Sequence, residues 1–381
     1  MSAQAGSSDR SSETASRHRP PRELYIDVFR GLMALVMVQG HVFDTLLTPL
    51  ARAQDLYRFQ QIFHGSTAPG FLFASGFVAG LPRAPLSLKA SLRRARRLLF
   101  VLGVGYALTL PYFSLFKTLA QASPSEQAAA LACHALQVIA VSQLLVLLLQ
   151  SIAGRRWVGW AGLLALLILA GSPWVWSSGL SARAPLFLGA YLDWSVAPSQ
   201  YPVFPFAAFV LSGTVAGSTL GRVDYAKRKR RAIFWGLGLL VLGLVLALAL
   251  SGRVDFWGPS PAYALLRLGG LLLLLRLSES ATSREIPGTR ALALLGHQTL
   301  LVYVLHLVLL FGGILGPGPL SAYAGRLGFA GAGLVLVLML PVLLVAAWLW
   351  HRAKAHSPHE ATLALVFLGV VFVLEFLTRP W

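Results

Sequence analysis

The chain has 381 residues, of which 56% are hydrophobic and only 12% are charged, and its mean hydropathy is +0.68. A soluble domain carries about twice that share of charged residues, so the composition excludes an ordinary soluble fold. The formal net charge of +18 does not indicate a nucleic-acid partner, because the Lys and Arg residues lie in short loops between apolar runs and no separate domain carries them.

The first 22 residues differ in composition from the rest of the chain. Residues 1–22 are rich in Ser and Arg and contain no apolar stretch ahead of a small-residue cleavage site. This pattern predicts a disordered cytoplasmic tail rather than a signal peptide. We expect residues 23–381 to form one membrane domain, because the loops after the tail are too short to fold independently.

Apolar runs long enough to cross a hydrocarbon core of ~30 Å recur along this domain. They predict an all-α fold, a polytopic membrane helix bundle with about eleven transmembrane helices. The expected spans are 24–47, 62–81, 95–114, 128–150, 157–175, 202–220, 232–250, 261–277, 291–312, 328–350 and 361–378. The stretch from Pro185 to Trp194 could form a short re-entrant segment.

The distribution of positive charge predicts the orientation. Counted with the adjoining helix ends, the tail and every second loop after it hold 23 Lys and Arg residues, whereas the other loops hold seven. Positively charged loops resist translocation, so the N-terminus is expected to be cytoplasmic. We expect a multi-pass protein of the bacterial inner membrane whose immediate partner is the lipid bilayer.

The first span carries four ionisable residues, which are costly in lipid unless they are paired or face a wet cavity. Arg30 and His41 are eleven residues apart, or about three turns, so they share a helix face about 16 Å apart along the axis. Asp27 and Asp44 lie close to that face. Polar contacts between helices are the alternative explanation, but four such groups on one stripe favour a functional site.

Two further groups of polar residues follow in the second and third spans. His64 lies near the outer end of the second span, and Ser75 lies within it among small residues that permit close helix packing. Arg93, Arg94, Arg96 and Arg97 begin the third span. They are either a topology anchor or an anion site for a phosphorylated cofactor, since guanidinium groups match phosphate oxygens.

The fourth and ninth spans each contain a polar pair. His134 and Gln137 share a face of the fourth span, after Cys133, the only cysteine, which excludes an internal disulfide and a cysteine-based zinc cluster. Tyr303 and His306 lie at i, i+3 in the ninth span. Both pairs could also be plain hydrogen bonding between helices.

In their order and spacing these motifs resemble the transmembrane acyltransferase superfamily, which joins the acyltransferase-3 proteins to the heparan-α-glucosaminide N-acetyltransferase-like proteins. The family's opening motif is similar to Asp27-x-x-Arg30-Gly31 followed by His41. Its second motif is similar to Phe73-x-Ser75-Gly76-Phe77 followed by the arginine cluster, and its last motif is similar to Tyr303-x-x-His306. The resemblance to the heparan branch rests on four blocks: Asp27-Val-Phe-Arg-Gly, His134-Ala-Leu-Gln-Val-Ile, Tyr201-Pro-Val-Phe-Pro-Phe and Leu300-Leu-Val-Tyr-Val-Leu-His306. Phe206-Ala-Ala departs from that branch's pattern.

The resemblance implies an enzyme that moves an acyl group, by default acetyl, from cytoplasmic acyl-CoA to a hydroxyl or amine acceptor, in a transfer that can cross the membrane. The acceptor class stays open among a sugar, a lipid and a small molecule. His41 would act as general base or carry the acyl group as an acyl-imidazole. Asp27, Arg30 and His306 would complete the catalytic set, Arg93, Arg94, Arg96, Arg97 and Ser75 would bind the CoA co-substrate, and His64, His134, Gln137 and Tyr303 would contact substrate.

No metal is expected in this site. The main alternative is a small-molecule or lipid transporter without covalent chemistry, which would explain buried charges equally well. Transporters commonly contain internal repeats, and the sequence shows no convincing repeat. A membrane scaffold or sensor is a third interpretation; it predicts that replacing His41 has no effect on function.

Overall fold

The computed structural model describes residues 23–82, 87–314 and 316–379, and over these ranges the chain forms helices joined by turns and loops, without a β-strand. The predicted all-α membrane bundle is therefore confirmed. The predicted tail, residues 1–22, lies outside the described residues.

Within the described ranges, eight helices are long and apolar enough to cross a membrane. They are α1 (Leu24–Leu46), α8 (Ala135–Ile152), α9 (Trp157–Ser177), α12 (Val203–Leu220), α13 (Tyr225–Ala249), α14 (Pro261–Ser283), α17 (Phe329–His356) and α18 (Pro358–Thr378). A ninth candidate is a broken span formed by α15 (Thr289–His297) and α16 (Thr299–Phe311), which meet at an angle of 82°.

Two of the predicted spans correspond to helices that are too short or too polar to count as membrane-spanning by length and composition. The helix α4 (Thr67–Gly80) has 14 residues, and α5 (Leu88–Ala107) begins with a strongly cationic segment. The predicted second span starts too early, because its first residues belong to a separate polar helix, α3 (Asp55–His64), which is capped by Gly65. The count of eleven spans and the cytoplasmic N-terminus stay predictions.

Shorter helices connect these elements. They are α2 (Pro49–Arg52), α6 (Leu115–Gln121), α7 (Pro124–Ala130), α10 (Leu180–Arg183) and α11 (Leu186–Leu192), with 3₁₀ turns at Gly154–Arg156 and Ser321–Tyr323. The helix that corresponds to the fourth predicted span, α8, begins at Ala135, seven residues later than predicted, because α7 and a turn precede it. The stretch predicted as re-entrant contains α11.

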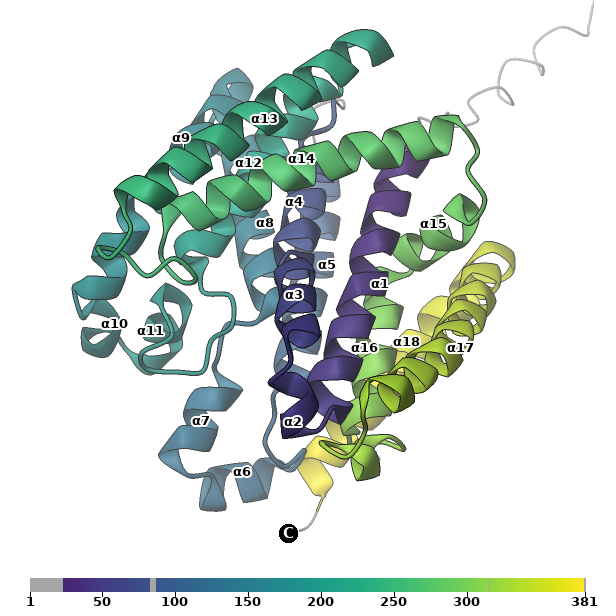
Figure 1. Cartoon of the computed structure of the whole chain (residues 1–381). Coiled ribbons are helices and arrows are strands. Elements are labelled where there is room, and N and C mark those ends of the chain that lie inside the picture. Colours follow the sequence, from purple (N-terminus) through teal and green to yellow (C-terminus); the bar gives the residue numbers. More distant parts are fainter. Residues whose placement is uncertain (1–22, 83–86, 315, 380–381) are drawn as a thin grey trace, which may run out of the picture.

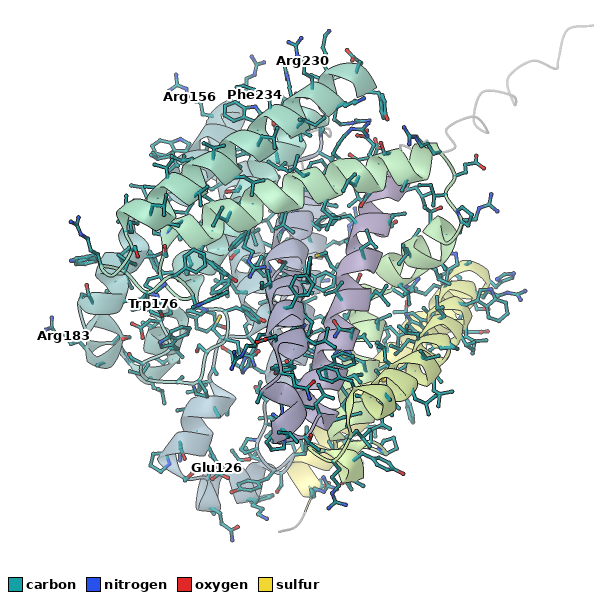
Figure 2. The ribbon with its side chains drawn as sticks, viewed as in Figure 1. Glu126, Arg156, Trp176, Arg183, Arg230 and Phe234 are labelled. Carbon is teal, nitrogen blue, oxygen red and sulfur yellow. The ribbon has the colours of Figure 1, made fainter. Side chains whose placement is uncertain are left out.

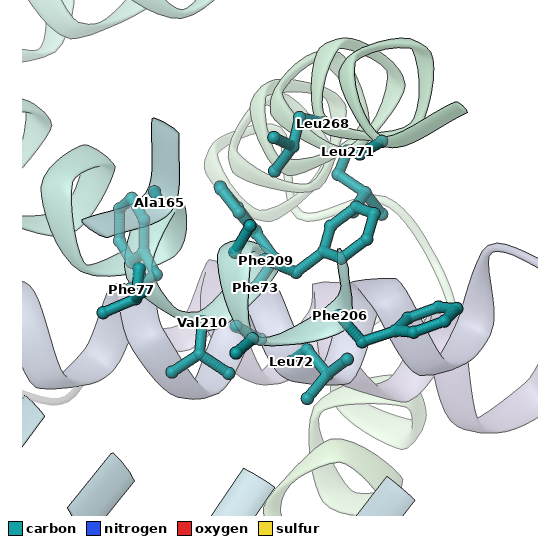
Figure 3. Close-up of a cluster of buried hydrophobic side chains, with 14 of the residues drawn as sticks. Leu72, Phe73, Phe77, Ala165, Phe206, Phe209, Val210, Leu268 and Leu271 are labelled. Atoms are coloured by element: carbon teal, nitrogen blue, oxygen red, sulfur yellow. The ribbon is translucent and has the colours of Figure 1, made fainter. Parts of the chain in front are cut away.

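The main core forms where α4 and α12 cross at backbone contact. A Cβ added to Gly76 would lie 1.9 Å from the carbonyl oxygen of Val210, and one added to Gly213 would lie 2.1 Å from that of Phe73. Small residues permit this approach, which is a common way for membrane helices to associate. Large aromatic side chains fill the space around the crossing, including Phe73, Phe77 and Phe209 (Figure 3).

The first helix separates two hydrophobic cores. Its beginning, with Ile26 and Phe29, belongs to the core around α4, α12 and α14, whereas its later residues, such as Val38 and Val42, pack with α16 and α17. Figure 1 shows α1 between these two groups of helices. Side chains on α1 can therefore meet residues that are far away in the sequence.

Charged side chains identify the two ends of the bundle. Figure 2 shows Arg156 and Arg230 at one end and Glu126 at the other. We call the first the arginine-rich end; α1 begins there and runs away from it (Figure 1). His41, in the second half of α1, is thus nearer the opposite end.

Candidate active site

Two histidines from α1 and α16 form a direct contact. His41 Nδ1 lies 2.7 Å from His306 Nε2, and the two rings are nearly parallel, with an interplanar angle of 12°. The His306 side chain is completely buried, and His41 is partly buried. The structure therefore brings together the two histidines that the sequence analysis placed in the catalytic set.

The hydrogen bonds around this pair assign its protons. His306 Nδ1 lies 2.9 Å from the carbonyl oxygen of Val302, which can only accept, so Nδ1 carries the hydrogen and donates it. In a neutral imidazole, His306 Nε2 is then an acceptor, and His41 Nδ1 must donate to it. This network leaves His41 Nε2 without a hydrogen and able to accept a proton.

A third histidine and a carboxylate extend the cluster. The His64 ring meets the His41 ring edge-on, with centroids 5.2 Å apart, and His64 Nε2 lies 3.4 Å from Asp44 Oδ2. Tyr57 donates to Asp44 Oδ1 at 2.9 Å, and Gln61 donates to the same oxygen. His64 Nδ1 is buried and has no hydrogen-bond partner among the described residues. We call His41, His64, His306 and Asp44 the histidine cluster.

The helix α14 holds the junction between α3 and α4, next to His64. Arg267 donates to the carbonyl oxygen of Ile62 and to Ser66 Oγ, and Tyr263 donates to the carbonyl oxygen of Gly65 at 3.3 Å. Arg267 lies within a span, where an arginine needs such acceptors. This anchor sets where α3 ends and fixes His64 beside α1.

Tyr303 lies on the other side of the histidine pair. Its ring contacts the His306 ring edge-on, with centroids 5.7 Å apart. The i, i+3 spacing of Tyr303 and His306 therefore places their side chains in direct contact.

Asp27 and Arg30, which the resemblance placed in the catalytic set, form an ion pair at the other end of α1. Arg30 Nη1 lies 3.6 Å from Asp27 Oδ1, and His297 Nδ1 lies 3.9 Å from Asp27 Oδ2. His297 in turn contacts the His351 ring edge-on at 5.1 Å. Because Asp27 is 14 residues before His41, or about 21 Å along the helix, this pair lies outside the histidine cluster.

The four clustered arginines divide into two groups. Arg94 is half-buried and donates to Gln150 Oε1 at 3.0 Å and to Gln143 Oε1 at 2.9 Å. Gln143 donates on to Ser75 Oγ at 3.2 Å, so one polar seam joins α5, α8 and α4. The other three side chains, Arg93, Arg96 and Arg97, are exposed. Arg94 therefore has a different environment from the other three arginines.

His134 and Gln137 lie at the start of α8, packed towards α5. Gln137 is 1% exposed, and neither atom of its amide has a hydrogen-bond partner among the described residues. The Nδ1 atom of His134 is likewise buried and unpartnered there. Buried polar atoms normally have partners, so this face is suited to a polar ligand. The described residues contain no group of three or more His, Cys, Asp or Glu residues that could hold a metal ion.

The residues that hold Asp44 and Asp27 in place were not predicted from the sequence. Tyr57 and Gln61 are spaced i, i+4 on α3, on one face of a polar helix, and this periodicity was available in the sequence. His297 and His351 could not be linked to Asp27 without tertiary structure.

A family model described as an acyltransferase domain, that of acyltransferase-3, matches residues 23–351. The match includes α1 with His41, α3 with His64 and α16 with His306. A search of curated proteins finds no match. Since the family model covers most of the chain, the protein belongs to the acyltransferase-3 family and is a membrane acyltransferase.

Proposed function

We propose that His41 is the general base in the transfer of an acyl group from acyl-CoA to a hydroxyl or amine acceptor. The observation that carries this proposal is the geometry of the histidine pair: His306 accepts from His41 Nδ1, which leaves His41 Nε2 free to take a proton. A buried, hydrogen-bonded partner that fixes the tautomer is also what orients the base in hydrolytic triads.

The proposed reaction proceeds through a tetrahedral intermediate. His41 Nε2 takes the proton from the acceptor O–H or N–H as that oxygen or nitrogen bonds to the thioester carbonyl carbon. The intermediate then collapses, the carbon–sulfur bond breaks, and the imidazolium of His41 returns the proton to the leaving CoA thiolate. The products are the acylated acceptor and free CoA, and His41 is again neutral.

The same geometry supports a second route in which His41 carries the acyl group. Its Nε2 would attack the thioester carbonyl carbon, the carbon–sulfur bond would break, and CoA would leave as the thiol with the proton that His41 Nδ1 gives up. The acceptor would then take the acyl group from this acyl-imidazole and return its proton to His41. The two routes predict different behaviour without acceptor. Labelled acetyl-CoA would leave an acid-sensitive label on the protein only in the second route, and the label would be absent in His41→Ala.

The donor is proposed to be acyl-CoA, by default acetyl-CoA, bound from the cytoplasm at the arginine-rich end. Arg94 and Ser75 share the polar seam that reaches into the bundle from that end, so we propose these two residues for the CoA phosphates. The acceptor, a sugar, lipid or small molecule, is proposed to enter on the side of His64, with Tyr303, His134 and Gln137 lining its approach. We also propose that the protein belongs to the heparan-α-glucosaminide N-acetyltransferase-like branch and that it lies in a bacterial inner membrane.

A thiol-release assay tests the enzyme and the base together. Purified protein in detergent receives acetyl-CoA and a pool of amino sugars and glycerol-type acceptors. We expect acceptor-dependent CoA release that is lost in His41→Ala and kept in His359→Ala, which replaces an exposed histidine on α18. Retained turnover in folded His41→Ala would remove this residue from the mechanism. No acetyl-CoA binding at all would favour the transporter.

A further inference from the structure

A groove of about 570 Å³ lies between α5 and α18 on the surface of the bundle. Phe100 lines it from α5, and residues of α18 between Thr362 and Leu374 line it from the other side; Thr362 is the one polar residue among them. Beyond the groove the loop between α5 and α6 reaches the end of α18: Phe113 packs edge-on against Phe372, and Ser114 Oγ donates to the carbonyl oxygen of Arg379 at 2.9 Å. The groove is thus open and apolar, with Phe100 of α5 on one side and α18 on the other, and we call it the crevice.

The helix α18, which forms one side of the groove, is almost entirely exposed. In its most apolar stretch only 6% of the residues are buried. This helix also lies beyond the end of the acyltransferase match at residue 351. An apolar crevice beside such a helix faces hydrocarbon, so its natural occupant is a lipid acyl chain rather than water.

Three exposed arginines continue the same face of α5 towards the arginine-rich end. Arg93, Arg96 and Arg97 precede Phe100 by seven, four and three residues, and at 3.6 residues per turn all four side chains fall on one face. Arg94 points away from that face and into the seam with α8. The guanidinium groups therefore lie one to two turns above the apolar crevice.

Of the two helices that line the groove, α5 carries the fixed positive charge at this end, and the last turns of α17 before α18 add Arg352 and Lys354. The first turn of α18 offers His359 and Glu360, both exposed, and so adds no fixed positive charge. Guanidinium groups pair bidentately with phosphate oxygens, and basic residues at a membrane surface attract anionic lipids. Positive groups directly above an apolar crevice match the two parts of a phospholipid.

We propose that Arg93, Arg96, Arg97 and the groove between α5 and α18 form a binding site for an anionic phospholipid. One acyl chain lies in the crevice beside Phe100, and the headgroup phosphate is bound by the three guanidinium groups. The proposal goes beyond the transfer reaction, because none of these residues belongs to the histidine cluster.

The helix α13 provides a matched control. Lys229, Arg230 and Arg231 are also exposed, and the apolar surface below them is formed by α13 alone, with Phe234 and Leu237 among its residues. It has the same number of cations but no crevice between two helices. Removing these charges changes the net charge equally without touching the proposed site.

The experiment counts lipids bound to delipidated full-length protein by native mass spectrometry. Dioleoyl-phosphatidylglycerol and dioleoyl-phosphatidylcholine are compared for the unaltered protein, R93Q/R96Q/R97Q, Gly369→Trp and K229Q/R230Q/R231Q. We expect the unaltered protein and the α13 variant to retain phosphatidylglycerol preferentially. The α5 variant and Gly369→Trp, which fills the crevice, should bind it roughly tenfold more weakly. Thermal unfolding checks that each variant is folded.

Three outcomes would overturn the site. The first is equal binding of the two lipids by the unaltered protein. The second is an equal loss in the α13 variant, which would reduce the effect to net charge. The third is an α5 variant that keeps phosphatidylglycerol but loses acetyl-CoA or inorganic phosphate, because the three arginines would then serve the donor.

Discussion

Gly40 lies directly beneath the ring of His64: a Cβ at position 40 would fall 1.8 Å from His64 Nδ1. The side-chain-free position on α1 is what allows the α3 histidine to approach His41. Gly40→Ala should therefore displace His64 from Asp44 and reduce kcat by about tenfold or more, a size expected when a supporting group is misplaced. Acetyl-CoA turnover measures the effect. Gly171→Ala, at a helical position with nothing within 4 Å, should leave kcat unchanged; equal turnover in both variants would contradict the arrangement.

His306 is expected to act by accepting from His41 Nδ1. Replacing it with Leu removes the acceptor and should lower kcat by about 10²-fold or more, as loss of a base's orienting partner does. Gln offers an oxygen that can accept the same hydrogen, so His306→Gln should retain clearly more activity than His306→Leu. The comparison of kcat in the two folded variants checks this. If Leu and Gln reduced activity equally, His306 would serve packing rather than orientation.

Arg94 is proposed to contact the CoA phosphates from the polar seam. Arg94→Gln should raise the apparent KM for acetyl-CoA more than it lowers kcat, because it removes binding that is equal in the ground and transition states. Steady-state kinetics with varied acetyl-CoA measure both constants. Arg230→Gln replaces an exposed arginine at the same end and should change neither. An unaltered KM in Arg94→Gln would leave this residue as a link between helices.

Gly296 and Gly31 let α15 cross α1 at backbone contact. A Cβ at Gly296 would lie 1.9 Å from the carbonyl oxygen of Asp27, and one at Gly31 would lie 1.9 Å from that of Leu292. Gly296→Ala should therefore lower the free energy of unfolding by on the order of 1–3 kcal/mol, the usual cost of overpacking. Gly333→Ala, at an open helical position, should be neutral or stabilising. Thermal unfolding in detergent distinguishes the two, and equal stability would mean that the crossing adapts.

Local sequence patterns predicted the membrane fold well, because apolar runs of sufficient length specify helices directly. They were less able to set boundaries where a short polar helix adjoins a span. The residues before Gly65 were assigned to the second span, whereas their polar face makes them the separate helix α3. The hydropathy of this region does not indicate the break between α3 and α4, whereas the periodicity of its polar residues does.

The candidate site was predictable in its parts but not in its assembly. His41 and His306 were both named from motifs, yet their contact joins positions 265 residues apart and depends on how α1 and α16 pack. Asp27 and Arg30 pair as their i, i+3 spacing predicts. They share a face of α1 with His41 but lie several turns away from it along the helix. Arg94 could have been separated from the adjacent arginines by helical periodicity alone.

The single helix α1 carries Asp27 near one end and His41 near the other, and α15 and α16 contact these two ends on either side of an 82° bend. If α1 tilts as one rigid helix, a movement that widens the gap between His41 and His306 also moves Asp27 relative to His297. Ligand binding beside His41 that tilts α1 would then change the environment of Asp27, and thermodynamic reciprocity would require an equal effect in the opposite direction.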